Sequence, residues 1–437
     1  MKKVLFIAYY FPPMGMGGVQ RAAKFVKYLP EFGWDPVVLT VKDVSYHAGD
    51  NTLLEEVEKA VIYRTGSLDP LRLHWKFFGQ KASSDRQQSG SSAHSGLLNR
   101  INAAFLSKLF IPDSKILWLP HAVLRSGKII RKIKPDLIFT TSPPHSVHCI
   151  GRALKKKYHI PWIMDFRDHL FNEMFQTDMP VWRRRNSEGL YRKISGSADK
   201  ILTVSAPIAG RLADLAKNKN VDFHVLPNGF DRSDFTGLRQ TKKNKKFTIG
   251  YCGTFNNYLN PGCLLKALQQ VIQRIPDIEK RMQFVFTGQV TDIQMQKNID
   301  ETGLSGLFKS TGYVSHKRSI QYMLDADLLF FLLPWNADPG MVTGKIYEYL
   351  ASGKPILAEV PEGDAADLLK IYGKNTIVAP GNEKILTDEI IRLYQLWEKG
   401  RLKTSMSYDK RLNRFDRRNQ CEELAGLFDS VCKKTSR

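Results

Sequence analysis

Short apolar runs alternate with amphipathic segments along most of the chain. The first run covers residues 4–10, and the apolar positions of residues 19–29 recur at the spacing of one helical face. Pro30 and Gly33 then end this predicted helix. Further strand-like runs cover residues 36–41, 136–142, 160–166, 200–205 and 223–227. Because buried runs that alternate with helices are typical of a parallel sheet covered on both faces, the pattern predicts an α/β fold.

A second series of the same kind begins after residues 232–246, which are polar and rich in lysine. Residues 263–275 form its first predicted amphipathic helix. The strand-like runs of this series cover residues 247–253, 284–289, 328–333, 354–360 and 375–380. A chain of 437 residues is also long for a single hydrophobic core. We therefore predict two α/β units that are joined near residues 230–246.

The composition is that of an ordinary globular protein, with 43% apolar and 25% charged residues. The longest apolar runs fall well short of the roughly 20 residues that a membrane-spanning helix needs. The start, MKKVLFIAYYF, resembles a signal peptide, but its apolar stretch is short and no small-residue cleavage site follows. The five cysteines show no CxxC pair, which argues against a disulfide framework or a zinc site. We therefore expect a cytoplasmic protein without a metal.

The net charge of +22 indicates a negatively charged partner. Basic residues cluster at 154–158, 182–186 and 242–246, and no known nucleic-acid-binding motif accompanies them. An anionic membrane surface or a lipid phosphate is therefore favoured over nucleic acid, which predicts a peripheral protein of the inner membrane face. The alternative is a lysine-rich surface that only keeps the protein in solution.

Residues 79–97 are rich in serine, glycine and glutamine, a composition typical of mobile segments. Basic and aromatic residues flank them at 71–78 and 97–112, so that residues 71–112 form a predicted insertion in the first unit. Residues 97–112 also have an apolar face with basic residues between. Such a segment either lies in a membrane interface or packs on its own domain.

The stretch between the first predicted strand and helix is rich in glycine (YYFPPMGMGGVQR, residues 9–21). Gly17 and Gly18 permit close approach of a ligand to the backbone, and a helix N-terminus carries partial positive charge. Gln20 and Arg21 lie in the first helical turn, where they can meet a polar ligand. The spacing is neither GxGxxG nor GxxxxGKS/T, so the dinucleotide and P-loop interpretations lack their motif. A tight turn without a ligand is the alternative.

A second turn with glycines, DPGMVTG (residues 338–344), precedes the segment KIYEYLASGKPILA. Lys345 and Glu348 are three residues apart, hence on one face of a helix. The carboxylate can accept two hydrogen bonds from a ribose diol, while helix N-terminal amides and the ammonium can hold a diphosphate. An ordinary surface ion pair between the two side chains is the alternative.

Five stretches share an order and spacing with a known family. They are residues 4–21, ADKILTVS (198–205), VLPNGFD (225–231), GYCGTF (250–255) and TGKIYEYLASGKPIL (343–357). Together they resemble the family-4-type GT-B glycosyltransferases, and the resemblance covers nearly the whole chain. It implies an α/β fold of two Rossmann-like domains whose parallel sheets face each other across a cleft.

The resemblance also implies a role for each domain. Residues 1–232 would bind the acceptor, residues 247–410 would bind the nucleotide-sugar, and a helix within residues 411–437 would pack back on the first domain. The implied reaction transfers a sugar from a nucleotide-sugar to a saccharide hydroxyl. It retains the anomeric configuration and needs neither a metal nor another cofactor.

Glu348 matches the second of two family glutamates that lie eight residues apart, so its implied role is to bind the ribose. The first glutamate falls on Gly340, so the carboxylate that meets the donor sugar is missing. The family's arginine and lysine that neutralise the diphosphate are also missing from residues 254–261. Lys345 stands where some relatives carry a lysine, and we expect it to be the catalytic cation for the diphosphate.

The resemblance implies further contacts with the nucleotide-sugar from both glycine-containing turns and from the end of the first strand of the second unit. These residues are Gly17, Gly18, Gln20, Gly253, Thr254, Met341, Val342, Thr343 and Gly344. Among them, Met341 and Val342 would offer backbone amides to the phosphates. Peptide dipoles and one ammonium would then meet the departing diphosphate.

Residues 160–169 resemble the family's strand that ends in a His-Asp pair. Arg167 stands in place of the histidine, and Asp168 matches the aspartate. Because arginine stays protonated, Arg167 would stabilise charge on the leaving phosphate or bind an anionic acceptor group instead of acting as a base. Asp165 would position the acceptor hydroxyl, and His169 would replace the histidine if the register slips. The alternative is a buried Asp–Arg pair that shapes a loop.

The acceptor implied by the resemblance and the charge is a lipid-linked saccharide in the synthesis of a bacterial surface polysaccharide. Two rival functions stay open. One is a sugar-nucleotide epimerase of similar fold, and the other is a protein that binds nucleotide-sugars without catalysis, which the missing glutamate at Gly340 makes tenable. The sequence specifies neither the sugar, the nucleotide base nor the linkage.

Overall fold

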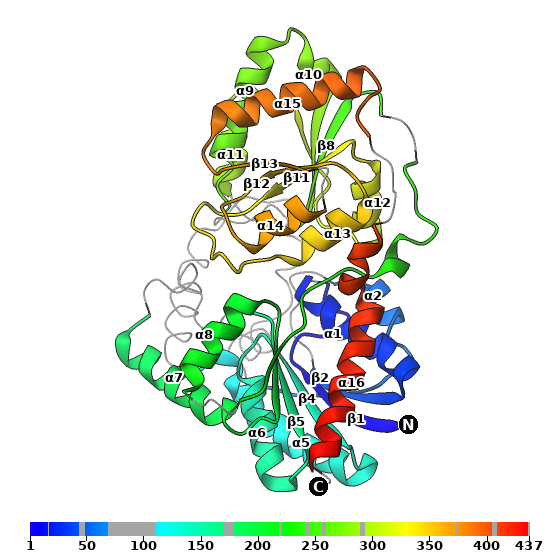
Figure 1. Cartoon of the computed structure of the whole chain (residues 1–437), viewed down its shortest axis with the longest axis vertical. Coiled ribbons are helices and arrows are strands. Elements are labelled where there is room, and N and C mark those ends of the chain that lie inside the picture. Colours follow the sequence, from blue (N-terminus) through cyan, green and yellow to red (C-terminus); the bar gives the residue numbers. More distant parts are fainter. Residues whose placement is uncertain are drawn as a thin grey trace. The chain divides into compact units, whose positions relative to one another are not determined.

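The computed structural model divides the chain into two compact units (Figure 1). The first comprises residues 1–227 and 420–437, and the second comprises residues 228–419. The structure describes all residues except 16, 43–48, 69–109, 169–178, 218–220, 242–243, 256–258, 289–292, 373–374, 404–408 and 436–437. Nearly all of the predicted insertion at 71–112 therefore lies outside the described residues, as does its expected role at a membrane.

The first unit is built on a sheet of seven parallel strands in the order β3-β2-β1-β4-β5-β6-β7. β1 lies inside the sheet because its residue Phe6 pairs with Val38 of β2 on one side and with Phe139 of β4 on the other. The strands are β1 (Lys2–Ala8), β2 (Trp34–Val41), β3 (Val61–Thr65), β4 (Leu137–Ser142), β5 (Trp162–Phe166), β6 (Lys200–Thr203) and β7 (Phe223–Val225).

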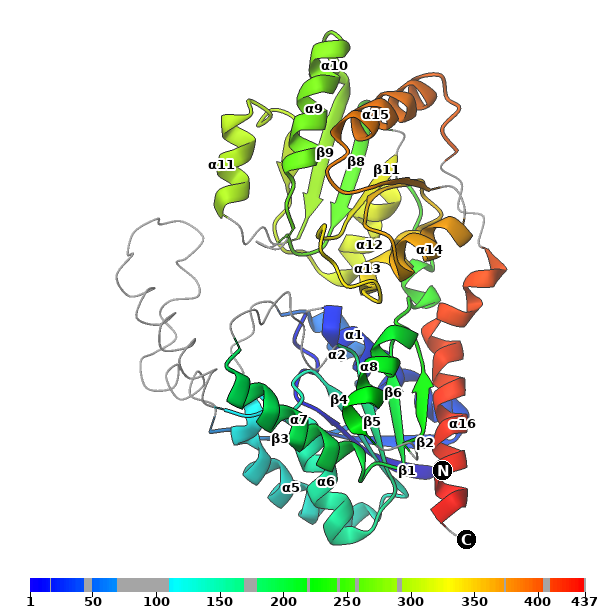
Figure 2. The same cartoon turned by 60° about the vertical axis from the view of Figure 1, so that its left-hand side comes forward.

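Helices cover both faces of this sheet, which is why β1 is apolar at consecutive positions (Figure 2). Leu5 and Ile7 pack toward one helix layer, whereas Val4 and Phe6 pack toward the other. Burial of each such side chain contributes about 2 kcal/mol to folding. The Leu5 side is covered by α5 (Leu119–Ile133), α6 (Val147–Tyr158), α7 (Val181–Ser195) and α8 (Ala206–Ala216). The Val4 side is covered by α1 (Gly17–Tyr28), α2 (Asn51–Glu55) and α16 (Arg417–Thr435).

The second unit has a sheet of six parallel strands in the order β10-β9-β8-β11-β12-β13. The strands are β8 (Phe247–Cys252), β9 (Met282–Thr287), β10 (Phe308–Ser310), β11 (Leu328–Leu332), β12 (Ile356–Glu359) and β13 (Thr376–Val378). Its helices are α9 (Gly262–Arg274), α10 (Ile278–Arg281), α11 (Ile293–Glu301), α12 (His316–Asp325), α13 (Gly344–Ser352), α14 (Asp364–Ile371) and α15 (Glu383–Glu398). Alternating strands and helices thus give the α/β fold that the sequence predicts.

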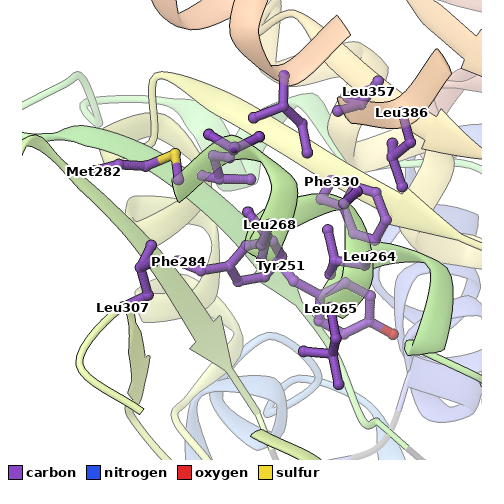
Figure 3. Close-up of a cluster of buried hydrophobic side chains, with 14 of the residues drawn as sticks. Tyr251, Leu264, Leu265, Leu268, Met282, Phe284, Leu307, Phe330, Leu357 and Leu386 are labelled. Carbon is purple, nitrogen blue, oxygen red and sulfur yellow. The ribbon is translucent and has the colours of Figure 1, made fainter. Parts of the chain in front are cut away.

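One face of the second sheet forms the core shown in Figure 3, where Leu264, Phe330 and Leu386 lie among other buried side chains. Tyr251 of β8 belongs to the same core. In β11, Phe331 follows Phe330 and points to the opposite face of the sheet, where it contacts the ring of Tyr349 in α13. Both faces of this sheet are therefore buried as well, which explains the unbroken apolar run in β11.

Strands β3 and β10 are not predicted from the sequence, and both lie at sheet edges. Within the described ranges, β3 pairs with β2 alone and β10 pairs with β9 alone. In β3 no residue is buried, and in β10 Lys309 and Ser310 are exposed. Without the second buried face, neither strand carries the continuous apolar run that marks the central strands. β1 also ends at Ala8, two residues before the predicted end of that run.

The boundary between the units differs by a few residues from the predicted one, because it falls after Pro227 and again after Asn419. The second crossing lies within the first turn of α16, whose buried residues Cys421, Leu424 and Phe428 join the core of the first unit. Inside the second unit, the two linking segments pair with each other through the bridge between Phe230 and Asp416. None of the described helices is both long and apolar enough to cross a membrane.

Two helix glycines of the first unit allow a test of this packing. In α6, a Cβ on Gly151 would lie 2.3 Å from the indole of Trp162, whose Nε1 donates a hydrogen bond of 2.9 Å to Thr140. We expect Gly151→Ala to lower the free energy of unfolding by about 1–3 kcal/mol, because the indole is fixed. Urea denaturation followed by circular dichroism measures the change.

Gly210 of α8 is the matched control, because a Cβ there would meet no atom within 4 Å. Gly210→Ala should raise the free energy of unfolding by about 0.5–1 kcal/mol, since alanine favours a helix interior. Equal effects of the two substitutions would contradict the described contact between α6 and Trp162.

Candidate functional site

The order of the strands creates one topological switch point in each sheet. In the first unit β1 neighbours β4, and the strands that follow them, β2 and β5, lie on opposite sides of this pair. In the second unit β8 neighbours β11, and β9 and β12 lie on opposite sides in the same way. Open parallel sheets bind ligands outside the carboxyl ends of the strands at such a point. The two glycine-containing turns follow β1 and β11, so both lie at these positions.

α13, after β11, begins with backbone N–H groups that no side chain caps. Thr343 is its N-cap residue, but the side chain makes no capping hydrogen bond. Its Oγ1 atom is buried and has no hydrogen-bond partner among the described residues. The N–H groups of Gly344 and Lys345 have no intrahelical partner either, because the first turn of a helix offers none. These donors and the helix dipole favour an anion here.

The ammonium of Lys345, in the first turn of α13, is held by the buried Tyr251. Its Nζ donates a hydrogen bond of 2.6 Å to the Tyr251 hydroxyl and lies 4.2 Å from the centre of that ring. The hydroxyl in turn donates to the carbonyl oxygen of Thr254 at 3.3 Å. An ammonium has three protons, and within the described part of the chain Lys345 forms no ion pair. Up to two protons therefore remain for a ligand.

Gly253, directly after β8, makes room for this ammonium. A Cβ at Gly253 would lie 3.0 Å from Lys345 Nζ, and its φ of +131° is one that other residues rarely adopt. Gly288 packs against it, because a Cβ there would lie 2.4 Å from the Gly253 carbonyl oxygen. Gly253 thus leaves the space that the Lys345 ammonium occupies, and its predicted contact with the donor stays a prediction.

Glu348, one turn after Lys345, is not paired with that lysine. Its Oε1 accepts a hydrogen bond of 2.9 Å from His316 Nε2, and His316 Nδ1 lies 3.7 Å from Asp234 Oδ2. Among the described residues, the ordinary Lys345–Glu348 ion pair that the spacing allows is therefore not formed. Glu348 keeps its second oxygen, and Lys345 keeps two protons, for other partners.

The turn before α13 corrects one predicted donor contact. The N–H of Met341 donates to the carbonyl oxygen of Asp338 at 2.8 Å, so it cannot also bind a phosphate. The N–H of Gly340 donates to Asp338 Oδ1 at 2.9 Å, because aspartate closes such turns with its side chain. The N–H of Val342 has no partner within the described ranges, so it stays a candidate.

In the first unit, Asp165 is buried in an ion pair with Arg21. Arg21 Nη2 lies 3.0 Å from Oδ1 and Nε lies 3.2 Å from Oδ2, and Thr141 Oγ1 donates to Oδ2 at 2.7 Å. Nη1 and Nη2 of Arg21 also donate to two carbonyl oxygens after β7. Because Asp165 and Arg21 are both buried and paired, direct contact of either with a ligand does not fit this arrangement. The predicted alternative, a buried Asp–Arg pair, forms with Arg21 instead of Arg167.

Arg167, just after β5, ties three segments together. Its Nε donates to the carbonyl oxygen of Ser142 at 2.5 Å, and its Nη1 donates to the carbonyl oxygen of Gly18 at the start of α1. Burial lowers its pKa, whereas Asp165 and Asp168 act in the opposite direction, and a guanidinium remains charged throughout. Its Nη2 has no hydrogen-bond partner among the described residues. Arg167 therefore offers a positive charge and one open donor group.

The other predicted residues of the first unit are more accessible. Asp168 and Gly18 are exposed, and Gln20 is half-buried, so all three stay candidates for ligand contact. Gly17 is the first residue of α1. His169 lies outside the described residues, so the predicted slip in register stays untested.

Two side chains that organise the second unit's site are missed by sequence reasoning. Tyr251 lies in a buried strand, where an aromatic residue indicates core, and only its contact with Lys345 reveals a second role. His316 begins α12, 32 residues before Glu348 in the sequence. No spacing rule connects such distant positions, so only the fold brings them together.

Comparison with sequence families decides the class of the protein. The family model described as Glycosyltransferase Family 4 matches residues 16–234, which is half of the chain. The chain belongs to glycosyltransferase family 4. A second family model, Glycosyl transferases group 1, matches residues 246–396 of this glycosyltransferase. No curated protein sequence matches the chain at a significant level.

Solved structures share the fold at low sequence identity. A glycosyltransferase from Rickettsia africae is 14% identical with a TM-score of 0.63, and the match covers 98% of both chains. Sucrose-phosphate synthase from Thermosynechococcus elongatus is 15% identical with a TM-score of 0.65, and the match covers 99% of both chains. A putative UDP-N-acetylglucosamine 2-epimerase from Listeria monocytogenes is 11% identical with a TM-score of 0.57, over 99% and 98% of the chains. At these identities the likeness establishes the fold of this glycosyltransferase and nothing finer.

The ion pair between Arg21 and Asp165 yields a test of its structural role. Asp165→Asn leaves the buried guanidinium without its counter-charge, which costs about 3–5 kcal/mol when one partner of a buried pair is removed. We expect a loss of that size in the free energy of unfolding, measured by urea denaturation.

Asp277→Asn is the matched control, because its partner Lys280 lies 2.8 Å away and both side chains are mostly exposed. An exposed ion pair contributes less than about 1 kcal/mol. If Asp165→Asn were as mild as this control, the pair would not be the anchor described here.

Proposed function

We propose that this glycosyltransferase moves a sugar from a nucleotide-sugar to a hydroxyl of a saccharide acceptor, with retention of the anomeric configuration. The observation that carries the proposal is the ammonium of Lys345, whose partner among the described residues is a tyrosine hydroxyl and not a carboxylate. Such a cation in the first turn of a helix with uncapped N–H groups suits a diphosphate. Membership of the family supports the reaction class.

The diphosphate of the donor would bind at the start of α13. The backbone N–H groups of Val342, Gly344 and Lys345 would donate to phosphate oxygens, together with Lys345 Nζ. The buried Thr343 hydroxyl supplies a further donor that has no partner within the described ranges. Glu348 would accept hydrogen bonds from the ribose hydroxyls, as a carboxylate with an open oxygen can.

Catalysis would come from these groups stabilising the negative charge of the leaving diphosphate. Negative charge builds on the departing phosphate oxygen as its bond to the sugar breaks. Fixed amides and the Lys345 ammonium stabilise that charge more in the transition state than in the bound donor. The acceptor hydroxyl would attack the same face of the sugar, and its proton would pass to the departing diphosphate. Neither a metal ion nor another cofactor takes part in this scheme.

Residues at the carboxyl edge of the first sheet would bind the acceptor. The open Nη2 of Arg167 suits an anionic group of the acceptor, because a guanidinium recognises phosphate and carboxylate. Asp168 is exposed and would accept a hydrogen bond from an acceptor hydroxyl. Asp165 would act indirectly, since its pair with Arg21 anchors α1 and the glycine-containing turn before it.

We further propose that the acceptor is lipid-linked and serves the synthesis of a bacterial surface polysaccharide at the inner face of the plasma membrane. The support is the helix layer formed by α5, α6 and α7 (Figure 2). α5 carries four lysine or arginine residues, α6 four and α7 five, and Glu188 is the one acidic residue of the three helices. Each cation near an anionic bilayer contributes about 1 kcal/mol to binding.

Exposed apolar side chains accompany these cations. Leu124 of α5 is 72% exposed, and Val181 and Trp182 at the start of α7 are 67% and 52% exposed. Arg183 connects that start of α7 to the segment before α5, because its Nη2 donates to the carbonyl oxygen of Phe110 at 3.2 Å. Exposed leucine and valine beside tryptophan and cations suit a bilayer interface.

The rival functions make different predictions about turnover. An epimerase would convert the nucleotide-sugar without an acceptor, whereas a binding protein would release no nucleoside diphosphate from any donor. Gly340, in place of a glutamate, is the observation that favours the second rival. Assays with and without acceptor therefore separate all three functions.

The central test uses donors based on UDP, GDP and ADP, with lipid-linked saccharides as acceptors. We expect nucleoside diphosphate release that depends on acceptor, survives EDTA and gives a product of unchanged anomeric configuration by NMR. Lys345→Met should lower kcat by about a hundred-fold, because no ammonium then stabilises the negative charge on the departing diphosphate. Glu348→Ala should raise KM for the donor about ten-fold.

Lys370→Met and Glu301→Ala are the controls, since both side chains lie exposed in the same unit. Neither should change kcat or KM by more than about two-fold. Full activity of Lys345→Met would refute the proposed diphosphate site. Sugar conversion without acceptor would establish the epimerase instead.

Charge reversal tests the membrane surface. Lys128→Glu, Arg131→Glu and Lys132→Glu together change the exposed side of α5 by six units of charge. We expect binding to vesicles that contain phosphatidylserine to fall at least ten-fold in a flotation assay, and wild-type binding to weaken with salt.

The control reverses Lys266, Lys309 and Lys384, which are exposed on the second unit and change the net charge equally. Vesicle binding should stay within two-fold of the wild type. Equal loss in both variants would mean that the overall charge attracts the protein, and that the face of α5, α6 and α7 has no special role.

A further inference from the structure

His316 joins Glu348 to a third side chain in the second unit. Its Nε2 donates to Glu348 Oε1 at 2.9 Å, and its Nδ1 lies 3.7 Å from Asp234 Oδ2. The side chains of His316, Asp234 and Glu348 are only 10%, 12% and 14% exposed. A bond between groups so shielded from water is stronger than the same bond at the surface.

Three separate elements supply these residues. Asp234 lies in η4 (Arg232–Phe235), His316 is the first residue of α12, and Glu348 lies in α13. α12 contacts both η4 and α13. The position of Asp234 is fixed in turn, because Asp231 caps η4 by accepting the Ser233 N–H at 2.8 Å. The imidazole is therefore held between two elements of defined position.

The bond from His316 constrains the Glu348 carboxylate without using it up. An ionised carboxylate only accepts hydrogen bonds and has about four acceptor positions. His316 takes one of them, on Oε1. No other described residue donates to this carboxylate, so the second position on Oε1 and both on Oε2 can accept two hydroxyl donors on adjacent carbons. A carboxylate fixed in advance also loses less rotamer freedom when a ligand arrives.

We propose that His316, which lies between Asp234 and Glu348, is a positioning residue that orients Glu348 for the two ribose hydroxyls of the donor. The inference rests on the proposed nucleotide site at α13. His316 itself does not contact the ribose in this scheme. The effect of His316 on nucleotide affinity therefore depends on Glu348 and on the ribose hydroxyls that donate hydrogen bonds to Glu348.

The test measures binding by calorimetry on the full chain. UDP, GDP and ADP are titrated first, and the tightest of them is then compared with its 2′,3′-dideoxy analogue. His316→Leu should weaken the ribonucleotide about ten-fold, the size of one hydrogen bond to a charged group, and leave the dideoxy analogue within two-fold. His316→Gln keeps an N–H donor toward Glu348 and should recover most of the affinity.

A double-mutant cycle sharpens the result. Glu348→Ala alone and His316→Leu with Glu348→Ala should bind the ribonucleotide equally weakly, because the histidine acts only through the glutamate. Asp234→Asn provides a second variant on the same path, with an expected loss smaller than that of His316→Leu. Circular dichroism confirms that each variant is folded.

The possible failures are distinguishable. If His316→Leu weakens the ribonucleotide and the dideoxy analogue equally, or weakens neither, the positioning role is overturned while the nucleotide site stands. If Glu348→Ala leaves the affinity unchanged, or the wild type binds none of the three nucleotides, the proposed donor site falls and this inference falls with it.

Discussion

The proposed site of the second unit depends on where the ammonium of Lys345 is held. Lys345 rests on the ring and hydroxyl of Tyr251 and over a position where only glycine fits, and Gly288 packs beneath that glycine in turn. Because its partner is a phenol and not a carboxylate, its charge is not neutralised by any described residue. The uncapped first turn of α13 adds donors of the same sign. The local geometry thus concentrates positive potential at one point on the carboxyl edge of the sheet.

The first unit uses its buried cations differently. Arg21 is neutralised by Asp165 and also donates to two carbonyl oxygens, so it stabilises the fold. Arg167 donates to two carbonyl oxygens, and its Nη2 has no partner among the described residues, so its charge is available to a ligand. The two arginines therefore have different roles, and the difference lies in the carboxylate that pairs with Arg21.

The sequence predicts the fold well because burial on both faces leaves long apolar runs in strands such as β11, and it misses β3 and β10 because edge strands lack that signal. Helix spacing correctly places Lys345 and Glu348 on one turn. It cannot reveal that Glu348 turns to His316, since that contact spans 32 positions. The predicted Met341 amide fails for a local reason, because Asp338 closes the turn and takes that proton. Contacts between residues far apart in the sequence and hydrogen bonds within turns are therefore the features that the sequence does not predict.

A crystal structure of the protein with bound UDP or GDP would show directly whether Lys345 receives the diphosphate. We expect the diphosphate to lie against the first turn of α13, with an oxygen within hydrogen-bond distance of Lys345 Nζ and with the ribose at Glu348. A nucleotide bound with its ribose and phosphates far from residues 340–348 would refute the proposed site.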